Sequence, residues 1–395
     1  MTAGTLEADD RAATSPGADA VSALATPALL LDRERLDRNL GRLRDRTAAL
    51  GAVLRPHMKT AKSIDVARRA FPGAPGPITV STLAEAEYFA GHGFTDITYA
   101  VGLSPLAASK AMRLRREGVD LKLLLDSPEQ ATALGAAARE AGVTASAFIE
   151  IDCDGHRGGL TPRDPRLLDV AARMAADGVR LAGVLTHAGE SYGLHTPEAL
   201  AAAAERERAE AVVAAEALRA AGHDCPIVSV GSTPTAHFAE DLTGVTELRA
   251  GVYMFFDLVM HGVGVCRLDD IAISVLATVI GTKPEKGWIL IDAGWMALSR
   301  DRGTAAQAVD QGYGVVCDVH GRVLDDLVVT QASQEHGILA MRSGSRRLLP
   351  DLPIGSKVRI LPNHACATAS QHEIYHVVSG PGDTIEARWP RIRGW

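Results

Sequence analysis

From residue 52 to residue 251 the chain alternates short β-type runs with long stretches rich in Ala, Leu and Arg. This alternation limits the possible folds more than any other feature, because it is typical of parallel α/β architecture. Eight runs can be counted, at 52–56, 78–81, 97–101, 121–126, 147–152, 181–187, 227–231 and 246–251. Eight strands with intervening helices predict a closed (β/α)₈ barrel, whose functional side chains gather at the carboxyl ends of the strands. An open, doubly wound parallel sheet is the alternative.

After Gly251 the pattern changes. Further β-type runs follow with few helical stretches between them, at 272–281, 288–293, 313–319, 327–331, 357–361 and 374–378. We therefore predict two domains, a barrel over 26–251 and a mostly β domain over 252–395. A strand-like run at 28–32 precedes the barrel, and we expect it to pair with the second domain. Residues 1–25 contain no apolar run and are predicted to be a loose, disordered tail.

Composition excludes several classes of partner. Hydrophobic residues make up 47% of the chain and charged residues 23%, as in ordinary globular proteins. The formal net charge of −7 gives no basic surplus for binding nucleic acid or an anionic membrane. The five cysteines are odd in number and form no CxxC pair, which argues for a reducing compartment. We therefore expect a cytoplasmic protein.

Lys59 follows the first predicted barrel strand, in the sequence Arg-Pro-His-Met-Lys-Thr. A lysine can hold an aldehyde cofactor covalently, and a turn rich in Gly, Ser and Thr can hold its phosphate. Such a turn, Gly231-Ser232-Thr233, follows the seventh strand at the start of a helix, where backbone N–H groups can bind an anion. The pair suggests pyridoxal phosphate. A surface lysine and a plain helix cap are the alternatives.

Polar side chains also follow the fifth, sixth and eighth strands. Arg157 lies in a charged loop and can bind the phenolate oxygen of the cofactor, unless it simply pairs with a neighbouring carboxylate. His187 can stack on the cofactor ring or transfer a proton, with Tyr192 as a nearby donor; a structural histidine is the alternative. Tyr253 is a candidate phosphate contact, although core packing is the more common role of such an aromatic residue.

The second domain contains one polar cluster, around His364 and Cys366. Residues two apart in an extended segment face the same side, so these two can bind one metal, and nitrogen with sulfur ligation favours Zn²⁺. Two protein ligands leave positions open for water and substrate, as a Lewis-acid metal requires. The alternative is a buried cysteine beside a hydrogen-bonded histidine. Gln334 and His336 are candidate substrate contacts.

These motifs, in this order, resemble the D-threonine aldolase and D-serine dehydratase family, relatives of the alanine racemase barrel that bind pyridoxal phosphate (fold type III). The similarity covers about residues 26–390, most specifically at 55–60, 187–192, 231–235, 335–337 and 362–366. It implies that Lys59 binds the cofactor covalently and that His364 and Cys366 bind a divalent metal near the β-hydroxyl of the substrate. The remaining implied cofactor contacts are Arg157 at the phenolate, Tyr192 near the ring, and Gly231, Ser232, Thr233 and Tyr253 at the phosphate or cofactor.

Within this family, the residues of the metal-binding motif differ between enzymes that catalyse different reactions. Aldolases tend to have Asp two residues after the metal-binding His, whereas D-serine dehydratases have Cys, as here. Thiolate suits zinc, whereas carboxylate suits manganese or magnesium. The resemblance therefore favours β-elimination from a small D-amino acid, converting D-serine to pyruvate and ammonia. Related enzymes commonly dimerise, so we expect a homodimer.

Three alternatives remain open at this point. An aldolase would cleave a β-hydroxy D-amino acid to glycine and an aldehyde, with His187 or a metal-bound water as base. A racemase would need a second proton donor opposite Lys59, and a non-catalytic pyridoxal-phosphate-binding protein would need no second domain. Ala61 stands where relatives often carry His, so the identity of the substrate stays open.

Overall fold

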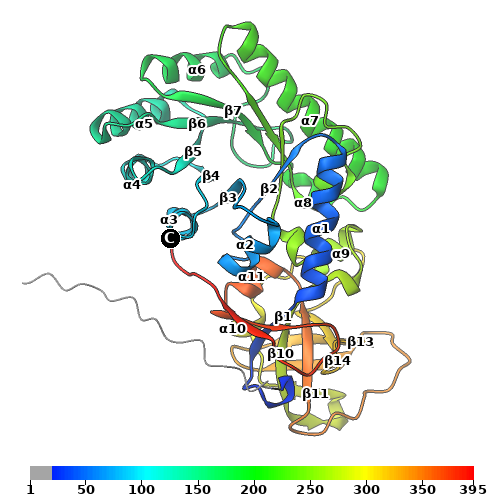
Figure 1. Ribbon diagram of the computed structural model, residues 1–395. Coiled ribbons are helices and arrows are strands. Elements are labelled where there is room, and N and C mark those ends of the chain that lie inside the picture. The colour runs from blue at the N-terminus through cyan, green and yellow to red at the C-terminus, as the bar shows by residue number, and fades with distance from the viewer. Residues whose placement is uncertain (1–19) are drawn as a thin grey trace, which may run out of the picture.

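The computed structural model describes residues 20–395, which form a barrel with a second, β-rich domain beneath it (Figure 1). The parallel barrel strands are β2 (Val53–Pro56), β3 (Ile78–Val80), β4 (Asp96–Gly102), β5 (Asp120–Leu125), β6 (Ser146–Ile151), β7 (Arg180–Thr186), β8 (Ile227–Val230) and β9 (Glu247–Ala250). They lie in the order β2-β9-β8-β7-β6-β5-β4-β3, and a parallel bridge between His57 and Thr79 joins the two ends. The predicted eight-stranded barrel is therefore confirmed, and the open sheet is excluded.

Helices cover the outside of the barrel (Figure 1). They are α2 (Ile64–Ala70), α3 (Leu83–Gly91), α4 (Pro105–Arg116), α5 (Pro128–Ala141), α6 (Arg166–Ala176), α7 (Pro197–Ala220) and α8 (Thr233–Phe238). The eighth place is taken by α1 (Arg33–Ala49), which precedes the barrel and packs against α2 and α8. Ser104, Ser127 and Thr196 cap α4, α5 and α7, and each of these helices begins with proline. The caps satisfy N–H groups that a helix start leaves without partners.

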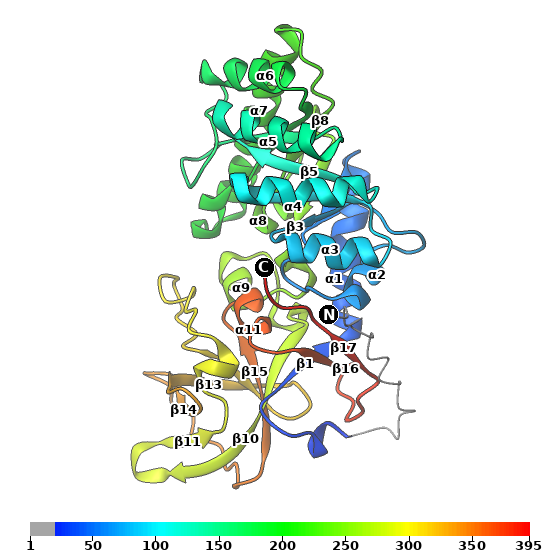
Figure 2. The same cartoon turned by 90° about the vertical axis from the view of Figure 1, so that its left-hand side faces the viewer.

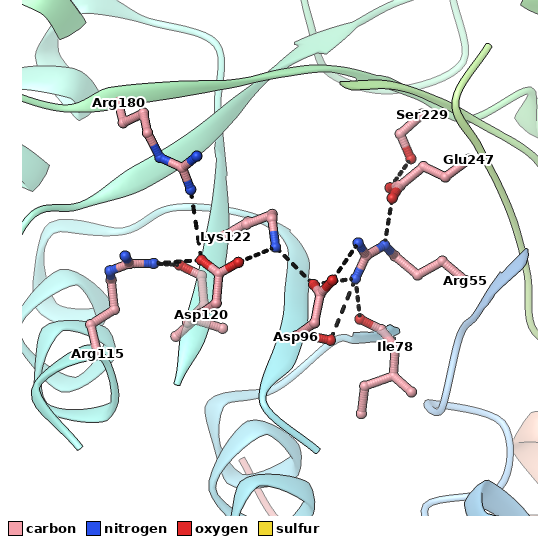
Figure 3. A network of polar contacts seen from close by, with 10 residues as sticks. Arg55, Ile78, Asp96, Arg115, Asp120, Lys122, Arg180, Ser229 and Glu247 are labelled. Carbon is pink, nitrogen blue, oxygen red and sulfur yellow. Dashed lines mark hydrogen bonds and ion pairs between the residues drawn. The ribbon is translucent and has the colours of Figure 1, made fainter. Parts of the chain in front are cut away.

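The interior of the barrel near the strand starts is charged, whereas such interiors are usually apolar. Arg55 of β2 donates to Glu247 of β9 at 2.8 Å and to Asp96 at 2.8 Å, and Lys122 of β5 donates to Asp96 at 2.7 Å (Figure 3). Asp120 continues the chain by accepting from Lys122 at 2.7 Å. The charges alternate in sign, so each buried group has an opposite partner that offsets the cost of its desolvation.

The second domain is built on one nine-stranded sheet. In spatial order its strands are β11 (Trp288–Ile291), β14 (Gly337–Met341), β13 (Val323–Ala332), β12 (Gly314–Cys317), β15 (Lys357–Pro362), β10 (Ile273–Lys283), β1 (Ala28–Asp32), β16 (Ile374–Val378) and β17 (Ala387–Pro390). All pairs are antiparallel except β1 with β16. Because β10 also pairs with β11, the six strands from β11 to β10 in this order form a closed ring. The mostly β second domain is as predicted.

Short helices connect the two domains. Helices α9 (Leu258–Val263) and α11 (Ala365–Ala369) lie between the barrel and the second sheet (Figure 2), and α10 (Trp295–Leu298) follows β11. Five 3₁₀ turns complete the described elements: η1 (Val21–Ala23), η2 (Gly189–Gly193), η3 (Val252–Met254), η4 (Leu268–Asp270) and η5 (Pro284–Lys286). Between residues 20 and 395, no helix is both long and apolar enough to cross a membrane.

The prediction that residues 1–25 form a disordered tail is wrong for the last of these residues. Residues 1–19 lie outside the described part of the chain, but Val21–Ala23 form η1 and Val21 is fully buried. Ser22 donates from its backbone and its hydroxyl to the Asp383 carboxylate, both at 2.9 Å. These anchors lie more than 350 positions away in the sequence, so local composition could not reveal them.

Candidate active site

A cavity of about 680 Å³ lies where the carboxyl ends of the barrel strands face the second domain. Its walls carry most of the polar groups that the sequence singled out. From the barrel come Lys59, Arg157, His187, Tyr192, Gly231, Ser232 and Thr233, and from the other side come His364 and Cys366. Enzymes with this barrel assemble their sites at this end of the strands, so the cavity is the candidate active site.

Lys59 is held by the closure of the barrel. The backbone N–H of His57 donates to Ala250 at 2.8 Å, and that of Met58 donates to Thr79 at 2.8 Å, so both neighbouring strands fix the segment. Met58 and Thr60 on either side are fully buried, whereas Lys59 is exposed to the cavity. The amine is therefore presented by a rigid backbone.

The two histidines beside Lys59 are held in the neutral form. Burial, with the nearby charges of Lys59 and Arg249, lowers the pKa of His57 far below its usual range. Burial likewise lowers the pKa of His187 to about 3. The Nδ1 atom of His187 lies 3.0 Å from the carbonyl oxygen of Gly231, so Nδ1 must carry the proton. Its Nε2 is then left as an uncharged acceptor.

The turn after β8 contains one threonine, Thr233, whose hydroxyl has no hydrogen-bond partner in the described residues. Gly231 donates its N–H to Glu207 at 2.9 Å, and Ser232 donates its N–H to the Thr235 hydroxyl at 3.0 Å. The hydroxyl of Thr233 is buried and has no hydrogen-bond partner among the described residues. As the first residue of α8, Thr233 also has a backbone N–H without a partner inside the helix. The hydroxyl of Thr233 is therefore available to bind an anion.

Gly231 is needed at this turn for steric reasons. Its φ is +135°, and a Cβ atom there would lie 2.0 Å from the carbonyl oxygen of Arg249. Because its N–H and its carbonyl are both already bonded, Gly231 shapes the turn and leaves anion contacts to its neighbour.

His364 and Cys366 lie close together on the side of the cavity formed by the second domain, and each affects the pKa of the other. The Nδ1 atom of His364 lies 2.5 Å from Asp301 Oδ2, and Cys366 Sγ lies 3.2 Å from the Thr60 hydroxyl. Burial opposes both charges, but Asp301 and Cys366 outweigh it and raise the pKa of His364 to about 11. Burial would raise the pKa of Cys366, but His364 and Lys59 outweigh burial and lower this pKa below its usual value. The thiol is thus prepared to lose its proton, as a metal-binding sulfur must.

In the described residues, no group of three or more His, Cys, Asp and Glu side chains is arranged to hold a metal ion. A metal at this wall would have His364 Nε2 and Cys366 Sγ as its protein ligands. Asp301 would orient the imidazole from behind, as carboxylates do in many metal sites.

Comparison with known proteins is consistent with this geometry. The family described as "Alanine racemase, N-terminal domain" matches residues 31–259, and the "Putative serine dehydratase domain" matches 272–378. D-threo-3-hydroxyaspartate dehydratase of Delftia sp. (strain HT23) is 54% identical over 380 residues, covering 95% of this chain and 100% of that protein. D-serine dehydratase of Dictyostelium discoideum is 31% identical, covering 94% of this chain and 98% of its own. The chain belongs to the D-serine dehydratase and D-threonine aldolase family.

Solved structures of the family agree with the fold. The Delftia dehydratase superposes with a TM-score of 0.92 at 54% identity, over 95% of this chain and 100% of that one. D-threonine aldolase from Filomicrobium marinum gives 0.80 at 27% identity, over 94% and 96%. Two structures of D-threo-3-hydroxyaspartate dehydratase are alanine variants, at a histidine and at a cysteine two positions further on, and the cysteine variant is described as metal-free.

Family membership confirms the resemblance found in the sequence. The relatives are named dehydratases and aldolases, so this chain is a pyridoxal-phosphate-dependent lyase that acts on D-amino acids. Neither the substrate nor the metal follows from membership alone.

Three predicted site residues do not join the others. Tyr253, which lies in η3, is fully buried in the core and is not among the residues that line the cavity. Its hydroxyl has no partner among the described residues. Gln334 and His336 are exposed in the turn between β13 and β14 and are likewise absent from the cavity wall. Arg157 lines the cavity but is largely exposed, 3.8 Å from Glu150.

Several cavity residues were missed from the sequence. Asp301 lies 63 positions before His364, and no spacing rule connects them. Asp257 is fully buried and accepts from the backbone N–H of Ala365 at 2.8 Å, which fixes the start of α11. Arg249 lies two residues after Glu247 on β9, and this alternation of charges could have indicated that both face the interior.

The buried histidines predict acid sensitivity. Burial lowers the pKa of His187 to about 3 and that of His237 to about 4. Because these values lie below that of an unfolded histidine, the unfolded chain takes up more protons as the pH falls. The stability they contribute is complete above pH ~6.5 and is lost between there and pH ~3, at ~1.4 kcal/mol per pKa unit. Urea midpoints should therefore fall steadily from pH 7 to pH 5.

A matched pair of variants tests this assignment. His237→Gln should flatten part of the pH dependence, whereas His195→Gln, at an exposed position, should leave it unchanged. Equal slopes in the two variants would show that acid loss arises elsewhere.

Proposed function

We propose that this lyase eliminates water from a D-amino acid that carries a β-hydroxyl group, giving a 2-oxo acid and ammonia. D-threo-3-hydroxyaspartate is the first candidate substrate and D-serine the second, in line with the relatives of those names. The observation that carries the proposal is that one cavity holds Lys59 together with the His364–Cys366 pair. A base for the α-proton and a site for a Lewis acid are the two requirements of such an elimination.

The residues of the cavity fit pyridoxal phosphate. Lys59 would hold the aldehyde carbon, and the unpaired hydroxyl of Thr233 would help to hold the phosphate. Arg157 is available to the phenolate oxygen and Tyr192 to the ring. When bound, pyridoxal phosphate accepts the electrons released as a bond to the substrate Cα breaks.

The His364–Cys366 pair fits a catalytic divalent metal. Its sulfur is primed for deprotonation, its imidazole is oriented by Asp301, and two ligands leave positions open. The histidine and cysteine replaced in the structures of D-threo-3-hydroxyaspartate dehydratase have the same spacing. Nitrogen and thiolate ligation favours zinc, with manganese or magnesium as alternatives. When bound, the metal would draw electrons from the β-hydroxyl oxygen and ease its departure.

The side chains of the cavity have different roles in this proposed reaction. The Lys59 amine would remove the α-proton of the substrate with Nζ. His57 and His187 line the same cavity in their neutral forms, so they add no positive charge beside Lys59. The second domain lies over the mouth of the barrel and contributes His364 and Cys366 to the wall of the cavity.

Aldol cleavage is the second candidate, favoured by one observation. His187 has an uncharged Nε2 that can accept the β-hydroxyl proton, which starts cleavage of the Cα–Cβ bond. Product analysis separates the two functions. Incubation with D-threo-3-hydroxyaspartate, D-serine and D-threonine should yield 2-oxo acids and ammonia if the chain is a dehydratase. Glycine and an aldehyde would overturn elimination in favour of aldol cleavage.

Thr233→Val tests the phosphate site. Valine has the same shape, and the hydroxyl that it replaces has no partner in the described protein, so we expect the fold to be kept. The dissociation constant of the cofactor should rise about 10-fold, the cost of one lost hydrogen bond to a charged group. Titration of the apoprotein with pyridoxal phosphate measures this. An unchanged constant would remove Thr233 from the site.

A further inference from the structure

Glu207 interrupts the apolar face of helix α7. The buried residues of this helix recur at helical spacing: Leu200, Ala203, Ala204, Glu207, Ala211, Ala214, Ala215 and Leu218. All are apolar except Glu207, which is 2% exposed. A carboxylate at such a position is costly unless its oxygens are satisfied. Glu207 does not line the cavity, so contact with substrate does not explain it.

The carboxylate binds three donors from two loops. Glu207 Oε1 accepts from the backbone N–H of Ala188 at 3.0 Å and from that of Gly231 at 2.9 Å. Glu207 Oε2 accepts from the hydroxyl of Thr235 at 2.7 Å. Ala188 directly follows His187, whereas Gly231 and Thr235 flank the turn that presents Thr233. One side chain therefore joins the loop after β7 to the loop after β8.

The same loops are joined a second time through His187. Its Nδ1 donates to the carbonyl of Gly231, whose N–H is the one that Glu207 holds. The Ser191 and Ser232 hydroxyls, 2.8 Å apart, add a third link. No basic side chain in residues 20–395 forms an ion pair with Glu207, so its bonds are those to the two loops. An apolar residue would pack in this place without fixing either loop.

We propose that Glu207 is a positioning residue, which sets the distance between His187 and the phosphate-binding Thr233 before the cofactor arrives. It acts on the cofactor through backbone groups and never touches it. The inference rests on the proposed role of Thr233 in holding the phosphate. Two loops held in advance lose less freedom on binding, so the carboxylate contributes to cofactor affinity.

The test compares three variants of the full-length protein. Glu207→Leu removes all three bonds, Glu207→Gln keeps an oxygen for the two N–H groups, and Glu216→Gln changes an exposed residue of the same helix. Apoprotein is titrated with pyridoxal phosphate, and hydrogen exchange is followed at the Ala188 and Gly231 amides. We expect the dissociation constant to rise about 10-fold or more in Glu207→Leu, less in Glu207→Gln, and not at all in Glu216→Gln.

Exchange at the two amides should quicken in Glu207→Leu even without cofactor, a change that a loss of overall stability alone would spread over the whole chain. If Glu207→Leu does not fold, Glu207→Asp replaces it. This carboxylate is one methylene too short to reach both loops, and the same rise in the dissociation constant is expected. Wild-type affinity together with protected amides in the folded variant would overturn the proposal. If the wild-type protein itself bound no pyridoxal phosphate, the proposed function would fail instead.

Discussion

Replacing Lys59 by alanine is expected to lower turnover by at least ~10⁴-fold, because in the proposed function Lys59 is both the covalent anchor of the cofactor and the base for the α-proton. The side chain is exposed to the cavity between two fully buried neighbours, so the backbone should keep its place. The variant should lack the visible absorbance band that pyridoxal phosphate gives when bound to a lysine. In the unchanged protein, borohydride should fix the cofactor to Lys59, which peptide mass analysis can locate.

Lys286→Ala supplies the control, since Lys286 is exposed in the second domain over the ring of Trp288. This variant should keep both the absorbance band and full turnover. A borohydride label on any lysine other than Lys59, or a band that persists in Lys59→Ala, would contradict the assignment of the cofactor site.

The sequence was most informative where local pattern decides structure. The barrel strands could be counted because buried parallel strands read as short apolar runs between helical stretches. Lys59, His187 and Thr233 could be proposed together because each follows a strand, and parallel strands all end at the same face. Position relative to a strand therefore predicts which residues share a cavity, even when more than 100 positions separate them.

The same reasoning failed where orientation or long-range pairing decides. Tyr253 follows a barrel strand like the others, but it lies in the 3₁₀ turn Val252–Met254 and is fully buried in the core. Gln334 and His336 were chosen for their polar character, which exposed turns share with active sites. Asp301 could not be predicted, because its partner His364 comes from a different strand connection and no period links the two.

Glu207 is an intermediate case. Its helical spacing places it on the buried face of α7, so the sequence alone shows a charge where an apolar residue is expected. What the sequence lacks is the identity of the donors, which come from residues 188, 231 and 235. A charge on an apolar stripe is therefore a useful signal of a constraint, whose nature only the fold reveals.

Replacement of Cys366, the proposed metal ligand, is expected to have the second large effect. Cys366→Ala should weaken metal binding at least ~100-fold, because one of two protein ligands is lost, and turnover should fall with metal occupancy. Asp301→Asn should weaken binding by about 10–100-fold, since it removes the carboxylate that orients His364. Both variants should keep the visible absorbance band, because Lys59 and Thr233 are untouched. Metal analysis by mass spectrometry and turnover with added Zn²⁺ measure the two effects.

Cys153→Ala is the matched control for the loss of a sulfur. Burial raises the pKa of Cys153 to about 12, so that thiol stays protonated, and it does not line the cavity. Metal content and turnover should therefore equal those of the unchanged protein.

Cys366→Asp probes the chemistry further, because a carboxylate should shift preference from zinc towards manganese or magnesium and raise aldol cleavage relative to elimination. If chelation leaves turnover intact, or if Cys366→Ala carries as much metal as the unchanged protein, the metal assignment is wrong. His364 and Cys366 would then be half-buried, hydrogen-bonded residues whose polar groups contribute only to the packing of α11 against the barrel.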